Sequence, residues 1–185
     1  DYGLIGNMHT AALVGRDGSL DWLCLPRFDS AACFSALLGE DADGRWLLAP
    51  AGEVERVERR YRTDTLVHEL DFHTEHGVVR VIDFMPPRDG EADLVRIVEG
   101  ISGEIPIQME LIVRLDYGSI IPWVRSIDGV WTATGGPDSL TLCTPATLTG
   151  VGLATRADFV VKPGDRVPFV LAWVPSHEPR DRKST

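Results

Sequence analysis

Apolar and polar side chains alternate along the segment from residue 105 to residue 116. One set of alternate positions is entirely apolar and comprises Ile105, Ile107, Met109, Leu111, Val113 and Leu115. The positions between them include Gln108, Glu110, Arg114 and Asp116. Successive side chains of a strand point to opposite faces, so this period of two predicts a half-buried strand.

A second alternating segment folds back on itself around a glycine. Alternate apolar positions from Leu66 to Phe72 lead into Thr74-Glu75-His76-Gly77, and alternation resumes from Val79 to Met85. The pattern predicts a β-hairpin closed by Gly77. Further turns are predicted at residues 15–18, 41–44, 102–103, 128–129, 135–138 and 162–165. Short strands separated by turns predict an all-β fold, an antiparallel sandwich or barrel.

Only one segment has a convincing helix pattern. Asp29 or Ser30 can cap a short helix over residues 31–38, and Gly39 suits the left-handed residue that ends a helix. We therefore expect one short helix in an otherwise β chain.

The charge of the chain excludes one class of partner. The 185 residues include 18 Lys and Arg against 28 Asp and Glu, a formal net charge of −10. Binding to a phosphate backbone requires a basic surface, so we expect no nucleic-acid partner. No apolar run approaches the roughly 18 to 20 residues of a membrane helix, and we expect no membrane partner. A homo-oligomer is compatible with the sequence.

The three cysteines, Cys24, Cys33 and Cys143, lie among apolar neighbours and form no Cys-x-x-Cys arrangement. An odd number of cysteines cannot pair completely within one chain. We interpret them as buried thiols of a protein in a reducing, cytoplasmic compartment.

Carboxylates are the first candidates for chemistry, because a glycosidase uses one carboxylic acid to protonate the leaving oxygen and a second carboxylate to activate water or attack. The candidates are Glu69, Asp71, Asp83 and Asp116. Alternation places most of them on a solvated face, which is where charged residues usually lie. We therefore assign no catalytic residue.

A metal site would need converging histidines and carboxylates, and the only local cluster comprises His68, Glu69, Asp71, His73 and His76. His68 shares its strand face with Leu70 and Phe72, whereas His73 shares the opposite face with Glu69 and Asp71. The cluster is therefore predicted to hold no metal, and His68 to be a hydrogen-bonded histidine of the core. No motif indicates a cofactor.

Aromatic side chains are the remaining route to sugar binding. Trp22, Trp46 and Trp173 lie within apolar segments, which predicts core positions. Tyr117 and Trp123 bracket residues 118–122 after the long strand, so we expect at least one of them on a loop.

Several blocks of the sequence, taken together, point to a known family. Residues 15–30 read GRDGSLDWLCLPRFDS. Further blocks are VIDFMPPR at 81–88, LVRIVEG at 94–100, LDYG at 115–118 and Pro122-Trp123. In this order they resemble the start of the bacterial trehalase-like and glucoamylase-like proteins of glycoside hydrolase family 15, over nearly the whole chain.

The resemblance implies a two-part protein, in which an N-terminal antiparallel β-sandwich of the supersandwich type precedes an (α/α)6 barrel that hydrolyses α-glucosidic bonds with inversion. Residues 1–175 would form the sandwich, and the charged residues 176–185 a linker toward the barrel. The glutamates that act as general acid and base in the family belong to the barrel, and no segment here matches them. The partners implied are that barrel in the same chain and an α-glucoside, either trehalose or a short α-glucan.

In such a protein, loops of the sandwich could edge the substrate pocket or contact the barrel. The candidates are Arg27, Phe28 and Asp29 in one group and Tyr117 and Trp123 in another. The alternative for the first group is purely local: Arg27 forms a local ion pair, Phe28 packs under the short helix, and Asp29 caps that helix.

Two other functions remain open. The chain could be an independent carbohydrate-binding or docking module without a role in hydrolysis, recognisable by exposed aromatics or an apolar patch. It could also be a sugar-processing sandwich of the mutarotase type, which would require a histidine and a carboxylate facing one cleft.

Overall fold

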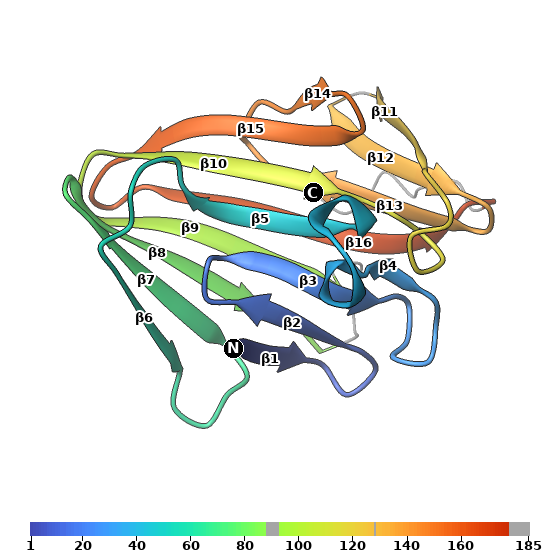
Figure 1. Ribbon diagram of the computed structural model, residues 1–185, viewed down its shortest axis with the longest axis horizontal. Coiled ribbons are helices and arrows are strands. Elements are labelled where there is room, and N and C mark those ends of the chain that lie inside the picture. The colour runs from blue at the N-terminus through green and yellow to red at the C-terminus, as the bar shows by residue number, and fades with distance from the viewer. Residues whose placement is uncertain (88–92, 128, 178–185) are drawn as a thin grey trace.

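The structure is a computed structural model that describes residues 1–87, 93–127 and 129–177 as two antiparallel sheets packed face to face (Figure 1). The first sheet comprises β1 (Tyr2–Gly6), β2 (Ala11–Gly15), β3 (Ser19–Cys24), β4 (Ala32–Phe34), β5 (Arg45–Pro50), β10 (Ile105–Ile112), β14 (Thr149–Val151) and β15 (Ala154–Val161). The second comprises β6 (Arg56–Tyr61), β7 (His68–Thr74), β8 (Gly77–Phe84), β9 (Leu94–Gly103), β11 (Trp123–Ile127), β12 (Val130–Gly135), β13 (Asp138–Cys143) and β16 (Arg166–Pro175).

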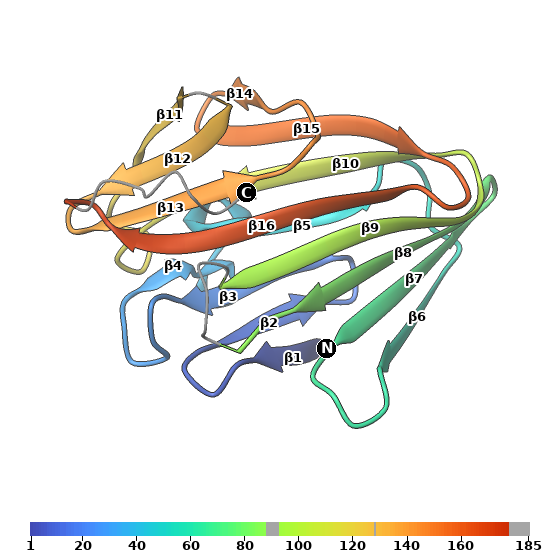
Figure 2. The ribbon, with the colours of Figure 1, turned by 180° about the vertical axis from the view of Figure 1, so that it is seen from behind.

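The order of the first sheet is β1-β2-β3-β5-β10-β15-β14, with β4 paired to β3. The order of the second is β11-β12-β13-β16-β9-β8-β7-β6, and this sheet lies in front in Figure 2. All the strand pairs are antiparallel. The predicted all-β antiparallel sandwich is thus confirmed.

The long alternating segment forms β10, in the middle of the first sheet. The six apolar residues from Ile105 to Leu115 are each at most 3% exposed and belong to the core between the sheets. Across the core, Trp46 of β5 meets Phe169 of β16 edge to face, with ring centroids 6.3 Å apart. Period-two patterning therefore predicted both the strand and its buried face.

The predicted hairpin is also confirmed, as β7 and β8 with Gly77 at its turn. Gly77 has a φ of 137°, and a Cβ there would collide with the backbone of Ser102. Glycine is required at this position for both reasons. The predicted turn at 128–129 lies partly outside the described residues.

The predicted helix over residues 31–38 is wrong. Residues 32–34 instead form β4, and only Ala36–Leu38 and Asp41–Asp43 form single turns of 3-10 helix, η1 and η2. Burial of all three β4 residues against β3 outweighs the local helix pattern. Asp29 caps no helix, and Gly39, with a φ of −151°, does not adopt the predicted left-handed conformation. None of the helical segments in the described ranges is long and apolar enough to cross a membrane.

Cys24 and Cys33 are buried as predicted, and burial raises the pKa of both thiols. Cys143 is exposed, contrary to the prediction. It is the last residue of β13 and follows four consecutive buried residues, so it lies where the strand leaves the buried part of the sheet. Trp46 is fully buried, whereas Trp22 and Trp173 are only partly buried.

Candidate functional site

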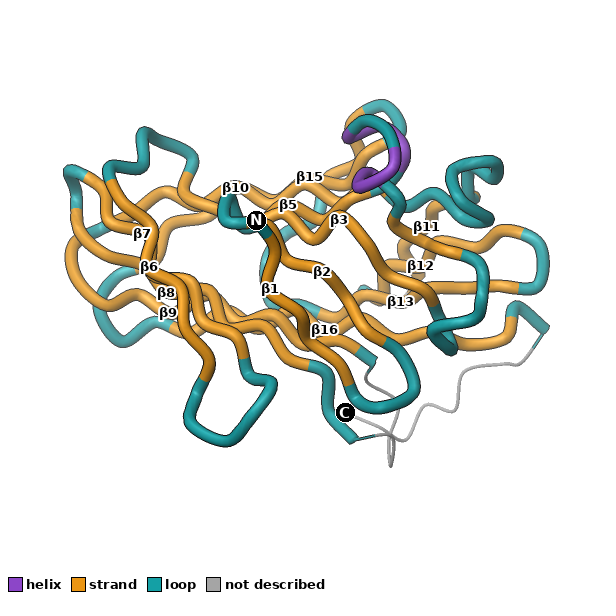
Figure 3. The backbone as a smooth tube through the Cα atoms, turned by 60° about the horizontal axis from the view of Figure 1, so that its bottom comes forward, coloured by secondary structure: helices purple, strands orange, loops and turns teal. Residues whose placement is uncertain are grey.

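Several loops lie together at one end of the sandwich, as Figures 1 and 3 show, and they carry exposed apolar side chains. This loop end consists of residues 7–10, 25–31, 35–44, 113–123 and 152–153. More than half of the surface is exposed in Met8, Phe28, Leu38, Tyr117, Ile121, Trp123 and Leu153. Single exposed apolar residues are ordinary, but a contiguous group of them marks an interaction surface.

The first group of predicted site residues forms a small loop of its own. The Arg27 guanidinium lies 2.8 Å from a carboxylate oxygen of Asp29, and both side chains are more than half exposed. The loop is fixed to the β1–β2 turn, because the Phe28 amide donates to the His9 carbonyl. The local Arg27–Asp29 pair is confirmed, but Phe28 is 68% exposed and packs under no helix.

Tyr117 is displayed by a strained turn. Asp116, Tyr117 and Gly118 all have positive φ, at 51°, 55° and 94°. Such a conformation is costly for a residue with a side chain and persists only when neighbours hold it. Here the Tyr117 amide donates to the Ala32 carbonyl, and Leu115 and Ile120 exchange two backbone hydrogen bonds. The turn exposes 54% of Tyr117 while its ring stays 6.2 Å from that of Trp22.

Trp123 opens β11, the outermost strand of the second sheet, and is 71% exposed. The Arg125 guanidinium lies over its ring, 5.4 Å from the centroid. The prediction that at least one of the two lies on a loop is thus confirmed by Tyr117, whereas Trp123 is exposed on a strand. Within the described residues, no hydrogen bond, ion pair or ring contact joins either of them to the Arg27–Asp29 loop, although all lie at the loop end.

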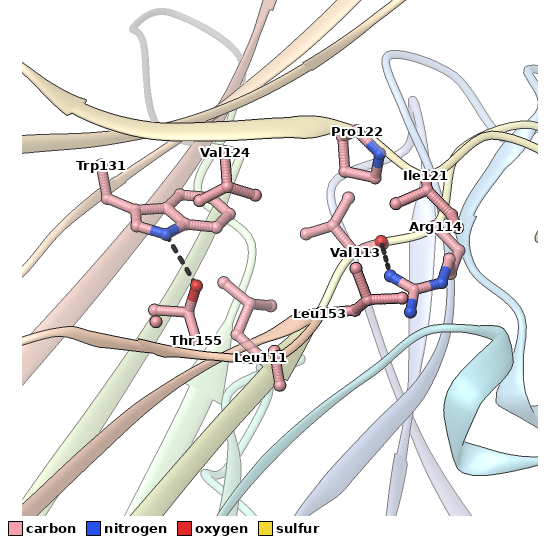
Figure 4. Close-up of a pocket in the computed structure, with 12 residues that line it drawn as sticks. Leu111, Val113, Arg114, Ile121, Pro122, Val124, Trp131, Leu153 and Thr155 are labelled. Atoms are coloured by element: carbon pink, nitrogen blue, oxygen red, sulfur yellow. Dashed lines mark hydrogen bonds between the residues drawn. The ribbon is translucent and has the colours of Figure 1, made fainter.

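A pocket of about 340 Å³ opens between the 113–124 segment and the β14–β15 turn (Figure 4). Its walls are mainly apolar, from Leu111, Val113, Ile121, Pro122, Val124 and Leu153. Trp131 closes the inner side, where its indole nitrogen donates to the Thr155 hydroxyl at 2.8 Å. The only charged residue in the lining is Arg114.

Arg114 is 8% exposed, and its Nη1 donates to the Val113 carbonyl at 2.7 Å. Burial lowers the pKa of Arg114, while the charge of Asp43 acts in the opposite direction. Alternation placed Arg114 on the polar face of β10, but the strand ends at Ile112. Beyond Ile112 the chain lies beside β4, where the Arg114 amide donates a hydrogen bond to the Cys33 carbonyl. Strand parity placed Val113 and Leu115 correctly in the core, but it could not predict the burial of Arg114, because the segments beside it, at Cys33 and Leu153, lie far away in the sequence.

The predicted catalytic candidates Glu69 and Asp71 are buried, not solvated. They lie on the outer face of β7, covered by arginines from both neighbouring strands: Arg62 and Arg60 bind Glu69, and Arg60 and Arg80 bind Asp71, at 2.5–2.9 Å. Burial alone would raise the pKa of each carboxyl, but these arginines lower both pKa values overall. A general acid needs a raised pKa, so this network suits structure better than catalysis.

Asp83 is also fully buried, in an ion pair with Arg96 that lies inside the core at 2.8 Å. Its strand neighbour His68 is buried as predicted, but neither ring nitrogen has a hydrogen-bond partner in the described part of the chain. The predicted hydrogen bond is therefore missing. No group of three or more metal-binding side chains converges within those residues either.

The fold and the loop end define a large antiparallel β-sandwich domain with an exposed apolar end. The family described as "Trehalase-like, N-terminal" matches residues 2–178. The chain belongs to this family.

Its relatives are considerably longer. The trehalase of Mycolicibacterium smegmatis is 30% identical over 200 residues, which cover 94% of this chain and 30% of that protein. The trehalase of Mycobacterium tuberculosis is 29% identical over 206 residues, covering 97% and 30%. Trehalase 1 of Sulfolobus acidocaldarius is 34% identical over 126 residues, covering 68% and 21%. The chain thus spans about 30% of the length of the mycobacterial trehalases, which fits a domain attached to a larger part.

Proposed function

We propose that this chain is the N-terminal β-sandwich domain, residues 1–175, of a cytoplasmic inverting α-glycosidase of the family 15 type that hydrolyses trehalose or a short α-glucan. Residues 176–185 lead to an (α/α)6 barrel that carries the catalytic residues. The sandwich supports the folding of that barrel, and its loop end edges the substrate pocket. Residues 178–185 of this linker lie outside the described residues.

The observation that carries the proposal is the exposed apolar loop end. Tyr117, Ile121, Trp123 and Leu153 leave more than half of their surface in water, and Ile121 and Leu153 line the same pocket. Covering such a surface gains roughly 25 cal/mol for each Å² of apolar area removed from water. A second domain of the same polypeptide is the partner that the length of the relatives favours.

The assignment of catalysis to the barrel is supported by the state of the acidic groups. Glu69, Asp71 and Asp83 all bind arginines, and the pKa values of Glu69 and Asp71 are lowered. The mutarotase alternative needs a histidine and a carboxylate in one cleft, but His68 and Asp83 are both fully buried. The choice of trehalose rests on the names of the relatives.

The test compares glucose release from trehalose and maltose by two proteins: the 185-residue chain and the same chain extended through its native downstream sequence. Circular dichroism first checks that the short chain is folded. We expect glucose only from the extended protein. Because the mechanism inverts one of the two anomeric carbons, trehalose should at first give α- and β-glucose in equal amounts in a proton NMR time course, whereas a retaining mechanism would give only the α-anomer. Turnover by the short chain would contradict the proposal.

The second candidate is an independent carbohydrate-binding or docking module, which the 71% exposure of Trp123 favours. Titration of the extended protein and of its Trp123→Ala variant with maltotriose separates the two functions. A binding module loses sugar affinity in the variant and keeps its hydrolysis rate. A pocket-edging residue changes KM for the hydrolysed substrate instead.

A further inference from the structure

The pocket beside Arg114 combines one buried cation with an apolar rim. Ile121 and Leu153 lie on either side of the guanidinium in Figure 4, and both are more than half exposed on their outer sides. The guanidinium carries five N–H donors, of which Nη1 binds the Val113 carbonyl. Within the described residues, no carboxylate lies within 4.0 Å of it, whereas most other arginines there have such a partner.

A buried guanidinium without a counter-ion is unusual, because removing a charge from water is costly unless it is paired. Arg96 is a second buried guanidinium of this chain, and all its partners come from the chain itself. It binds both oxygens of Asp83 and the carbonyls of Trp46 and Gly18, at 2.5–3.3 Å. Arg114 has one such bond and an opening of about 340 Å³ beside it. The missing partner therefore has room to enter from outside.

We propose that the Arg114 pocket receives an aspartate or glutamate side chain from the part of the full-length protein that follows this chain. The carboxylate pairs with the Arg114 guanidinium while apolar neighbours of the entering residue cover Ile121, Trp123 and Leu153. This inference rests on the proposed function and names the contact by which the two parts recognise each other.

The charge and the apolar rim of the pocket together favour a carboxylate that belongs to a protein segment. A carboxylate matches the fork of guanidinium donors, and arginine and tryptophan are typical of the central contacts of protein interfaces. A free small anion would satisfy the charge but leave the rim of Ile121 and Leu153 in water. A protein segment satisfies both features, and the relatives, about three times as long as this chain, contain the additional polypeptide.

The first experiment places a photo-crosslinking residue in the full-length protein, as Leu153→p-benzoylphenylalanine, with Tyr117→p-benzoylphenylalanine as the matched control at the same end. Mass spectrometry then identifies the captured peptide. We expect position 153 to capture one downstream peptide that contains Asp or Glu. Capture of a peptide without a carboxylate, of a second copy, or of nothing would overturn the inference.

The control separates this inference from the proposed function. If position 117 captures downstream peptides and position 153 does not, the domains dock but the pocket is not used in the proposed way. If neither position captures a downstream peptide, docking through the loop end also fails, and the proposed function fails with it.

The second experiment measures the affinity between the two parts after cutting the full-length protein at a protease site introduced within residues 178–185. Arg114→Met should weaken their association at least about tenfold, since truncating one partner of a desolvated ion pair is costly. Arg156→Met is the matched control, because Arg156 is half exposed and binds Glu110 on the sheet surface. Arg114→Lys keeps the charge and should retain part of the affinity, which also covers the case in which the Met variant fails to fold. Equal affinities for Arg114→Met and the wild type would refute the pairing.

A double-mutant cycle identifies the partner. The acidic residue captured in the first experiment is changed to its amide in the wild-type and Arg114→Met proteins. The amide change should weaken association in the wild type and have little further effect beside Arg114→Met. Fully additive losses would show that the two side chains do not pair.

Discussion

Two buried arginines lie in two regions of this sandwich, and the regions differ in whether the chain supplies an ion-pair partner for the buried guanidinium. Arg96 lies at the centre, 0% exposed, bound to Asp83 and two backbone carbonyls and packed 5.2 Å from the centroid of the Trp46 ring. Arg114 lies at the loop end, 8% exposed, with a single hydrogen bond to the neighbouring carbonyl. Both side chains are removed from water, but among the described residues only Arg96 of the two has a carboxylate within 4.0 Å of its guanidinium.

The difference separates what the domain needs for its own folding from what it presents to other molecules. A buried charge is costly unless it is paired, and the chain itself supplies the partners of Arg96. The loop end combines an unneutralised charge with exposed aromatic and aliphatic side chains. The centre should therefore govern the intrinsic stability of the domain, and the loop end should respond mainly to a partner.

The largest effect is expected from breaking the central pair. Asp83→Ala leaves the Arg96 guanidinium buried without its counter-ion, which should lower the free energy of unfolding by about 3–5 kcal/mol. Urea denaturation followed by tryptophan fluorescence measures the loss. The double variant Asp83→Leu/Arg96→Met removes both charges and should be clearly more stable than Asp83→Ala. A loss below about 1 kcal/mol in the single variant would show that Arg96 needs no carboxylate.

A second effect comes from His68, a buried polar group of the central region without a hydrogen-bond partner. Burial lowers its pKa below the ordinary 6.5; Asp83 raises the pKa, whereas Arg59 and Arg96 lower it. The unfolded chain therefore takes up this proton at a higher pH than the folded chain, so the free energy of unfolding should fall as the pH falls below 6.5. His68→Phe should remove that slope. A wild-type stability that is constant between pH 7 and pH 5 would contradict the expectation.

Acid unfolding at lower pH should have a different origin. The pKa values of Glu69 and Asp71 lie below the ordinary 4.5 and 3.8, so the stability they contribute is present above these values. It is lost as the pH falls through their lowered pKa values, because the folded state then has to bind protons that the unfolded state already holds. Asp71→Asn should reduce the loss of unfolding free energy at this lower pH. The pH dependence below 6.5 that comes from His68 should stay unchanged when urea denaturation is repeated across the pH range.

The sequence predicted the centre of the molecule far better than its loop end. Alternation identified β10, the β7–β8 hairpin and the apolar face of each, because a sheet with one buried face imposes a period of two on its residues. The same rule failed for Glu69 and Asp71. Both lie on the outer face as parity requires, but arginines of β6 and β8 bury them there, and cross-strand neighbours are not visible in the spacing of one segment.

The loop end was only partly predictable. The exposure of Tyr117 and Trp123 followed from their place beside a glycine-containing and proline-containing turn. The burial of Arg114 depends on β4, which the sequence presented as a helix, and its pocket is completed by the β14–β15 turn nearly 40 residues further along the chain. Contacts between segments so far apart depend on the whole topology.

A smaller effect tests the loop end directly. Arg114→Met in the 185-residue chain should change the free energy of unfolding by no more than about 1 kcal/mol and is expected to raise it, since replacing a buried charge by a group of similar shape is often neutral or stabilising. Arg96→Met provides the comparison and should be strongly destabilising, because it leaves Asp83 buried and unpaired. If Arg114→Met and Arg96→Met lower the free energy of unfolding by similar amounts, the loop end and the centre do not differ in the way described.

The smallest effect is expected from the exposed pair within the loop end. Arg27 and Asp29 form a well-aligned ion pair, and their hydrogen bond raises the pKa of Arg27 and lowers that of Asp29. Both side chains nevertheless remain in water, where the attraction is screened and offset by the side-chain order it requires. Arg27→Ala should leave the unfolding midpoint of the 185-residue chain unchanged. If the same variant alters KM for trehalose in the full-length protein, the loop edges the substrate pocket; if it changes neither quantity, the ion pair only shapes its own loop, and the contact with the rest of the protein lies on the side of Tyr117 and Arg114.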